Sequence, residues 1–244
     1  MIGEPFIILP TIDSTNNYAK GLIRDGLAKL GTVVFAEEQT QGRGQKNNQW
    51  HSEQGVNIMM SVILDTTWLS INEQFQLSCA TAVACSDFFS KYAGDETCIK
   101  WPNDLYWRDR KAGGILIENL IKGNIGEKAI VGIGININQI NFNQMKNKPV
   151  SLKQITGQSF DVKLLARELC TFLDKRYNEL KEGNFENHLD LYNQRLFKRG
   201  EAVTLKKGNE MFAATIESVN KNGELMTDNQ LQSIFTHGEV EWIL

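Results

Sequence analysis

Three segments of the sequence hold the residue types that could do chemistry. The first, EEQTQGRGQKNNQW at residues 37–50, follows an apolar run and places a glycine on each side of Arg43. Flanking glycines let the backbone approach an anion while the guanidinium binds it, which suits a carboxylate or a phosphate ligand. Polar loops of this length inside a compact domain are usually functional or disordered. The Gly-Arg-Gly triplet alone is equally typical of a flexible surface turn.

The second segment, KWPNDLYWRDRKAGGILIEN at residues 100–119, combines oxygen ligands, a cation and a glycine pair. Asn103 and Asp104 supply oxygen atoms of the kind that magnesium prefers. Lys111 lies at the start of an apolar strand that contains Gly113 and Gly114. Adjacent glycines in a strand often mark the close approach of a ligand or of another backbone. The same residues also fit a Pro-Asn-Asp turn and a solvated lysine.

The third segment, GIGININ at residues 132–138, is an apolar strand that ends in asparagines. It also fits a buried strand followed by a turn. The sequence contains no GxGxxG fingerprint and no Walker sequence, so neither a Rossmann dinucleotide site nor a P-loop is expected. No single segment of the three decides the function.

Short strands mixed with a few helices must position these segments. Apolar runs bounded by glycine, asparagine or proline predict strands at residues 6–9, 32–36, 57–64, 115–119 and 129–137. Helical spacing predicts helices at about 15–25, 72–92, 164–180 and 188–196, the first opened by a Ser-Thr-Asn cluster suited to N-capping. Because strands and helices do not alternate regularly, we expect an α+β fold with a mixed β-sheet packed with helices.

The C-terminal part of the chain differs in character from the rest. From about residue 200, turn signals such as Lys-Gly-Asn and Asn-Gly separate predicted strands at 202–205, 211–219, 224–227, 233–235 and 240–243. We therefore expect a main domain at residues 1–198 and a small C-terminal β-barrel at residues 199–244.

The bulk composition bears on compartment and partners. The 244 residues are 41% apolar with a net charge of −3 and no basic stripe, so nucleic acid is not expected as a partner. The N-terminus lacks the pattern of a signal peptide, and no apolar run is long enough to span a bilayer. The four cysteines show no CxxC spacing, and buried free thiols are typical of a reducing compartment. These features predict a cytoplasmic protein.

Four blocks in this order resemble the biotin protein ligase family over nearly the whole chain. The blocks are DSTNNYA at 13–19, QTQGRG at 39–44, KWPNDLYW…KAGGILIE at 100–118 and GIGININ at 132–138. The KWPND sequence followed by K-x-G-G-I-L-I-E is highly specific. The strand-rich C-terminus lies where that family has an SH3-like barrel, so the resemblance implies this fold for residues 199–244.

The resemblance implies a role for each matching position. Positions that match biotin-binding residues are Ser14, Thr15, Asn16, Gln39, Gly42, Arg43, Lys111, Gly113 and Gly114. Positions that match residues implicated in contacts with adenine, the ATP phosphates or magnesium are Arg43, Trp50, Asn103, Asp104, Lys111 and Asn136. Lys111 corresponds to the lysine that contacts the biotin carboxylate and then the acyl phosphate, and Arg43 to the loop that folds over biotin. These two are the catalytic candidates, and Asp104 is the magnesium candidate.

The implied reaction activates biotin with ATP and Mg²⁺ as biotinyl-5′-AMP. It then transfers the biotinyl group to a lysine in the acceptor domain of a biotin-dependent carboxylase. Neither nucleic acid nor a membrane is an expected partner, and the oligomeric state stays open between a monomer and a homodimer.

The sequence disfavours three alternative functions. A lipoate or octanoate protein ligase shares the fold and the adenylation step, but its Arg-x-x-Gly-Gly-Gly loop has no counterpart here. A biotin-sensing repressor needs an N-terminal helix-turn-helix, and the first block begins at Asp13, so no DNA-binding domain is expected. A binding module without catalysis is disfavoured by Lys111, Arg43 and Asp104.

One departure from the family pattern concerns the loop after Arg43. Many members continue as Gly-Arg-Gly-Arg, whereas this chain has Gln45 followed by Lys46. An amide supplies a neutral hydrogen bond in place of a charged one. We therefore expect weaker retention of the adenylate unless Lys46 provides the charge.

Overall fold

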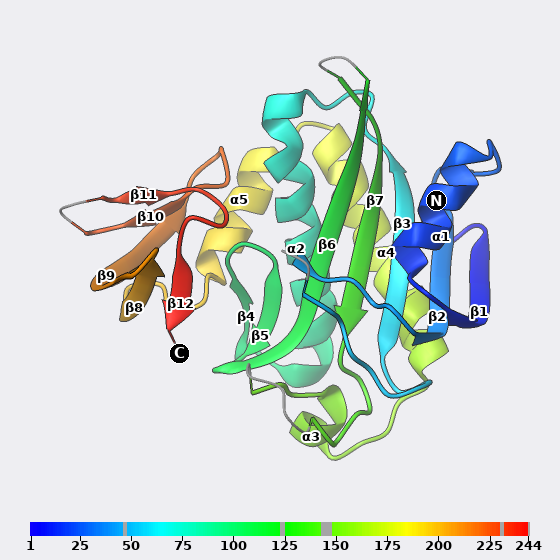
Figure 1. Cartoon of the computed structure of the whole chain (residues 1–244), viewed down its shortest axis with the longest axis horizontal. Helices are drawn as coiled ribbons and strands as arrows, with labels where there is room; N and C mark the ends of the chain where they lie inside the picture. The colour runs from blue at the N-terminus through cyan, green and yellow to red at the C-terminus, as the bar shows by residue number, and fades with distance from the viewer. Residues whose placement is uncertain (46–47, 123–124, 143–147, 230–231, 244) are drawn as a thin grey trace.

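The structure is a computed structural model that describes residues 1–45, 48–122, 125–142, 148–229 and 232–243 (Figure 1). Its strands form one seven-stranded and one five-stranded sheet. Lys46, for which the sequence suggested a charge-supplying role, lies outside the described residues.

The seven-stranded sheet is mixed, as the sequence predicted. Its order is β1-β2-β3-β7-β6-β5-β4, with β1 and β2 parallel and every other neighbouring pair antiparallel. The strands are β1 (Phe6–Ile12), β2 (Val33–Gln39), β3 (Ile58–Asp65), β4 (Thr97–Lys100), β5 (Asp104–Trp107), β6 (Arg110–Lys122) and β7 (Ile125–Ile135). β4 and β5 were not predicted; each has four residues and includes a charged side chain, which left too short an apolar pattern to detect.

Helices cover the two faces of this sheet unequally. The helical elements are α1 (Thr15–Arg24), η2 (Ile71–Glu73), α2 (Gln74–Ala93), α3 (Leu152–Thr156), α4 (Val162–Lys181) and α5 (Phe185–Gln194). In Figure 1, α2 and α4 lie behind the sheet. Phe35 and Val62 belong to the large core that also contains Phe88 of α2, whereas Val34 and Ile63 belong to a small core under α1. Side chains alternate between the faces of a strand, so β2 and β3 are apolar at successive positions because both faces are buried.

The predicted C-terminal strands form the second, antiparallel sheet. Its strands are β8 (Ala202–Lys207), β9 (Glu210–Val219), β10 (Leu225–Thr227), β11 (Ile234–Phe235) and β12 (Glu241–Ile243), in the order β11-β10-β9-β8-β12. This sheet lies beside β4, β5 and α5 (Figure 1). Trp101 Nε1 donates to the carbonyl of Gly223 at 2.9 Å, and the Asn193 side chain bonds both the N–H and the carbonyl of Val219. These contacts join the C-terminal sheet to the β4–β5 connection and to α5.

The cysteines agree with the expectation of free and mostly buried thiols. All four cysteines are free, and Cys79, Cys85 and Cys170 are buried. Burial raises the pKa of the Cys170 thiol to about 12, so the thiol stays protonated and unreactive at neutral pH. Within the described ranges, no helix is both long enough and apolar enough to cross a membrane.

Candidate active site

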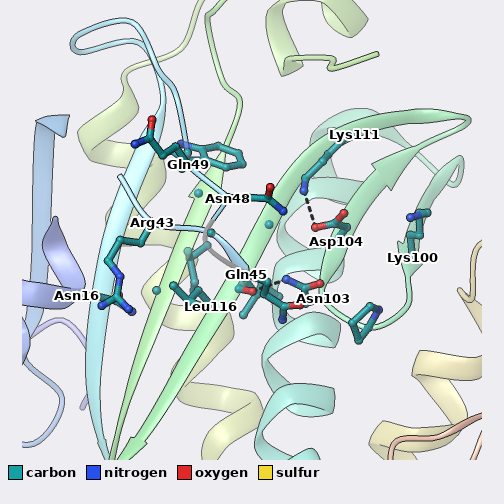
Figure 2. A pocket seen from close by; sticks show the side chains of 18 of the residues that line it. Asn16, Arg43, Gln45, Asn48, Gln49, Lys100, Asn103, Asp104, Lys111 and Leu116 are labelled. Carbon is teal, nitrogen blue, oxygen red and sulfur yellow. Dashed lines mark hydrogen bonds and ion pairs between the residues drawn. The ribbon is translucent and has the colours of Figure 1, made fainter. Parts of the chain in front are cut away.

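A cavity of about 720 Å³ lies on the face of the seven-stranded sheet where α1 begins. Its walls come from the first turn of α1, residues 43–45 and 48–51 of the loop, strands β5 to β7, and residues 237–238 and 240–242 next to the C-terminal sheet. Figure 2 shows side chains from the loop and from these strands around this space. The cavity gathers residues from all three of the segments that the sequence singled out.

One end of the cavity is a cluster of neutral polar groups. Gln39 Oε1 accepts hydrogen bonds from the backbone N–H and the hydroxyl of Thr15, at 2.8 and 3.1 Å. Ser61 Oγ lies 2.7 Å from Thr15 Oγ1 and 2.5 Å from Asn16 Oδ1. This network fixes amide and hydroxyl groups in place, so they can match a small polar ligand without rearranging.

Ser14 differs from the sequence expectation. It occupies the N-cap position of α1, but its side chain makes no capping hydrogen bond. Its hydroxyl is buried and has no partner among the described residues. Because an unpaired buried hydroxyl is costly, a ligand that bonds to it gains affinity.

The glycines of the GIGININ segment make room for two cavity side chains. A Cβ atom on Gly132 would lie 2.4 Å from Asn16 Oδ1, and one on Gly134 would lie 2.6 Å from a ring carbon of Trp50. Residues two apart on a strand share a face, so both glycines open the same side of β7. This role was not predicted from the sequence, although the i, i+2 spacing of the glycines is a usable signal.

Lys111 and Asp104 form an ion pair in the wall of the cavity, with Nζ and Oδ1 2.6 Å apart (Figure 2). Asp104 lies at the start of β5, directly opposite Gly114 on β6. A Cβ on Gly114 would come within 3.4 Å of the Asp104 carboxylate and 3.6 Å of the Lys111 ammonium. The absence of a side chain there leaves both charged groups open to the cavity.

The predicted asparagines hold the backbone around this pair. Asn103 Nδ2 donates to the carbonyl of Ile115 at 2.7 Å. Asn136 Nδ2 donates to the carbonyls of Val150 and Lys111, at 3.2 and 3.4 Å. Both asparagines line the cavity, so they also have access to a ligand.

Arg43 has partners of its own in the protein. Its Nη1 lies 3.1 Å from both carboxylate oxygens of Glu118 and 3.1 Å from Asn17 Oδ1. The sequence had suggested that this guanidinium grips an anionic ligand. The structure instead shows it paired with a carboxylate of the chain, although Arg43 also lines the cavity.

Most predicted site residues come together in this cavity. Those that line it are Ser14, Thr15, Asn16, Gln39, Arg43, Trp50, Asn103, Asp104, Lys111, Gly114 and Asn136. Gly42 and Gly113 do not line it, because each lies against backbone. A Cβ on Gly42 would be 2.4 Å from the carbonyl oxygen of Trp50, and one on Gly113 would be 2.7 Å from that of Gly134. These two glycines permit the close approach of a neighbouring backbone segment.

Lys100 and the C-terminal segment were not assigned roles from sequence. Lys100 lines the cavity with its ammonium 5.4 Å from the ring centre of Tyr106 and 5.2 Å from that of Trp242. Burial lowers the pKa of Lys100, and the nearby Asp104 carboxylate partly offsets this. The two rings provide a cation–π site that links the C-terminal sheet to the cavity.

Asp104 also suits a magnesium ion. In the part of the chain that the structure describes, no three His, Cys, Asp or Glu side chains gather into a metal site. Magnesium commonly takes one or two carboxylates and completes its shell with water and substrate phosphates. A single carboxylate at the cavity wall therefore fits a magnesium that arrives with a phosphate ligand.

Comparison with known proteins agrees with the geometry. The sequence model of the "Biotin/lipoate A/B protein ligase family" matches residues 8–136. The chain is similar to the "Bifunctional ligase/repressor BirA" of Bacillus spizizenii, with 30% identity over 94% of this chain and 71% of that protein. It is also similar to the "Biotin--[acetyl-CoA-carboxylase] ligase" of Mycobacterium tuberculosis, with 26% identity over 81% of this chain and 73% of that protein.

A solved structure shows the same likeness in three dimensions. The biotin protein ligase from Aquifex aeolicus, in complex with biotin and ATP, matches with a TM-score of 0.82 and 26% identity over 98% of both chains.

The chain covers only about half of two further sequence relatives. It spans 57% of the bifunctional ligase/repressor of Bacillus subtilis and 51% of that of Escherichia coli.

Proposed function

The chain belongs to the biotin/lipoate A/B protein ligase family, and on this premise we propose that it activates biotin with ATP and transfers it to a protein lysine. The intermediate is biotinyl-5′-AMP, and the product is an amide between biotin and the acceptor. The observation that carries this proposal is one continuous cavity with a neutral polar cluster at one end and the Lys111–Asp104 pair farther along. A volume of about 720 Å³ suits a small acid and a nucleotide held together.

The polar cluster fits the ureido group of biotin. That group has N–H donors and a carbonyl acceptor in a fixed ring. The unpaired hydroxyl of Ser14 and the oriented Thr15 and Gln39 side chains offer complementary donors and acceptors. With the ureido ring held at this end, the valeryl chain of biotin extends along β6 and β7 toward Lys111.

Lys111 then performs the electrostatic part of the activation. The biotin carboxylate must attack the α-phosphate of ATP although both groups are anions. The Lys111 ammonium, held by Asp104, neutralises the two anions and the charge that develops at phosphorus. Pyrophosphate leaves, and the amine of the acceptor lysine attacks the biotinyl carbonyl and releases AMP. No covalent bond to the enzyme is required.

Two further contacts complete the nucleotide side. Trp50, whose ring packs on Gly134, offers a flat surface for adenine, and its buried Nε1 has no partner among the described residues. Asp104 would hold a magnesium ion that arrives with ATP, and this ion would neutralise charge on the phosphates.

Finer features of the proposal rest on the relatives and on composition. We place the acceptor lysine in the biotin domain of a carboxylase, the class named for the mycobacterial relative. We place the protein in the cytoplasm, where buried thiols such as Cys79 and Cys85 stay reduced. We take residues 1–198 as the catalytic domain and 199–244 as an SH3-like barrel, supported by five short antiparallel strands. A monomer and a homodimer are both compatible with this mechanism.

One assay tests the function directly. The purified protein is incubated with ATP, magnesium and biotin, lipoate or octanoate, and pyrophosphate release is measured. We expect release with biotin and magnesium only. Release with lipoate or octanoate but not with biotin would assign the chain to the lipoate branch of the family.

A further inference from the structure

The Glu118 carboxylate connects three segments that border the cavity. Both of its oxygens lie 3.1 Å from Arg43 Nη1, and Oε2 also accepts a hydrogen bond from Asn16 Nδ2 at 2.8 Å. Glu118 belongs to β6, Asn16 to α1 and Arg43 to the loop. The Arg43 side chain is 43% exposed and that of Glu118 is 22% exposed, so the pair lies at the rim.

The described parts of the loop, residues 42–45 and 48–50, pair with each other as the two arms of a small hairpin. Arg43 and Gln49 form an antiparallel β-bridge. The N–H of Trp50 donates to the carbonyl of Gly42 at 2.9 Å, and the N–H of Gly44 donates to the carbonyl of Asn48 at 2.7 Å. These bonds tie the two arms together. Whatever holds one arm against the sheet therefore holds the whole hairpin.

Each arm of the hairpin has one anchor on the sheet. On the second arm, the Trp50 ring packs over Gly134 of β7. On the first arm, the ion pair joins Arg43 to Glu118 of β6. The Trp50 anchor belongs to the proposed nucleotide site, whereas Glu118 does not line the cavity. The hairpin is thus fastened by a group that is not needed to contact a substrate.

We propose that Glu118 is a positioning residue that latches the loop over the cavity through Arg43 and so retains the adenylate until the acceptor arrives. This inference rests on the proposed function and names a regulation of that same site. In this arrangement the Arg43 guanidinium faces Glu118, so its part in the latch is to hold the hairpin in place. Loss of either partner frees the same arm, so the increases in adenylate escape caused by the two single substitutions should not add in the double variant.

Substitution of either partner tests the latch. Glu118→Gln keeps an oxygen acceptor for Asn16 but removes the charge that attracts Arg43. Biotinyl-AMP escape is measured by trapping with hydroxylamine in the absence of acceptor, for the wild type, Glu118→Gln, Arg43→Gln and the double variant. We expect about two- to fivefold faster escape in each single variant, the size typical of a partly exposed ion pair. In Glu118→Gln, the KM for biotin should stay close to that of the wild type.

The double variant and a charge exchange distinguish a latch from two separate effects. Biotinyl-AMP should escape from the double variant no faster than from the single variant with the faster escape. Arg43→Glu combined with Glu118→Arg should restore part of the retention that Arg43→Glu alone removes. Glu168→Gln breaks a 2.6 Å ion pair with Lys91 elsewhere on the surface and should leave escape unchanged. Unchanged escape in Glu118→Gln, or effects that multiply in the double variant, would overturn the proposal.

A ligand-free measurement separates the latch from the proposed function. Amide hydrogen exchange over residues 42–50 is compared in the wild type, Glu118→Gln and Glu168→Gln without biotin or ATP. We expect faster exchange in Glu118→Gln alone. If wild-type protein releases pyrophosphate with biotin but exchange does not change, the latch is wrong and the function stands. If biotin supports no release but exchange quickens in Glu118→Gln, the loop anchor stands and the function is wrong.

Discussion

Lys111 Nζ lies 2.6 Å from Asp104 Oδ1 because a β-bulge turns the lysine toward the cavity. The register of β5 and β6 shifts by one residue at Ala112, so Lys111 and not Ala112 lies opposite Tyr106. Side chains alternate between the faces of a strand, and an extra residue reverses the alternation beyond it. Without the bulge, Lys111 would point into the core where Ala112 is fully buried.

The first prediction concerns the loss of this ammonium. Lys111→Ala should lower the rate of adenylation by about a hundredfold or more, because a preorganised charge at the developing anion is removed. The Asp104 carboxylate then faces the phosphates without its cation and adds repulsion. Biotin-dependent pyrophosphate release measures the effect, and circular dichroism checks that the fold is retained.

Lys91→Ala is the matched control for that variant. Lys91 also forms a 2.6 Å ion pair, with Glu168, but on an exposed surface away from the cavity. It should keep wild-type adenylation. Near-normal adenylation by Lys111→Ala would show that the lysine serves the structure and not the reaction.

The second prediction uses the two glycines of β7 to separate the two substrates. In Gly132→Ala the new Cβ would lie 2.4 Å from Asn16 Oδ1, so Asn16 must move and the KM for biotin should rise. In Gly134→Ala it would lie 2.6 Å from the Trp50 ring, so Trp50 must move and the KM for ATP should rise. Displacements of this size in a site can cost up to about a hundredfold in kcat/KM.

Each of these two variants is the matched control for the other, because both add one methyl group to the same face of one strand. Steady-state kinetics with each substrate varied in turn gives the two KM values. Equal changes in both KM values in both variants would mean that the sheet is distorted as a whole. The assignment of the two ends of the cavity would then fail.

Much of the fold could be predicted from periodicity, and the failures have identifiable causes. β2 and β3 have continuous apolar runs because both of their faces are buried. β1 has only intermediate and exposed positions, and its apolar run covers only part of the strand. β4 and β5 were missed because Pro102 separates two four-residue strands that contain Lys100 and Asp104. Ser14 was correctly placed at the start of α1, but propensity cannot tell that its hydroxyl faces a cavity instead of capping the helix.

The site was predictable by residue type but not by partner. The resemblance named Lys111, Asp104 and Arg43, yet no local pattern relates Arg43 to Glu118, which lies 75 positions away. The adjacent glycines at 113 and 114 looked equivalent in sequence. Strand alternation makes only Gly114 face the cavity, while Gly113 lies against the backbone of β7.

The third prediction concerns acid stability of the C-terminal sheet. Hydrogen bonds from Lys207, and then from Gln232 and the backbone at Thr236, lower the pKa of Glu239 from 4.5 to about 2. Because the folded-state pKa is lower than the unfolded one, the stability from Glu239 is present above pH 4.5 and is lost as pH falls toward 2. Glu239→Gln should therefore lower the Tm at pH 7 by about 1–4 °C, and by progressively less below pH 4.5.

Thermal unfolding of wild type and variant from pH 7 down to pH 3 measures this difference. Glu217→Gln, an exposed carboxylate on β9 of the same sheet, serves as the control and should show no such trend. A Tm difference that stays constant over this pH range would mean that the carboxylate of Glu239 is not the stabilising group.

The last prediction returns to the loop, where Gln45 replaces an arginine that many family members have. Gln45 lines the cavity, and its carbonyl accepts the N–H of Asn48 at 3.0 Å. An arginine at this position could donate charged hydrogen bonds to the adenylate, which contribute about 1.5–3 kcal/mol against about 0.5–1.5 for neutral ones. Gln45→Arg should therefore slow the escape of biotinyl-AMP by about tenfold.

Hydroxylamine trapping measures escape, and Gln45→Leu, which has neither charge nor amide, should speed it. Because residue 45 would act by direct contact with the adenylate and the Arg43–Glu118 pair acts by holding the loop, the effect of Gln45→Arg should persist in Glu118→Gln. If Gln45→Arg and Gln45→Leu retain the intermediate equally well, residue 45 does not contact the adenylate, and retention depends on closure of the loop alone.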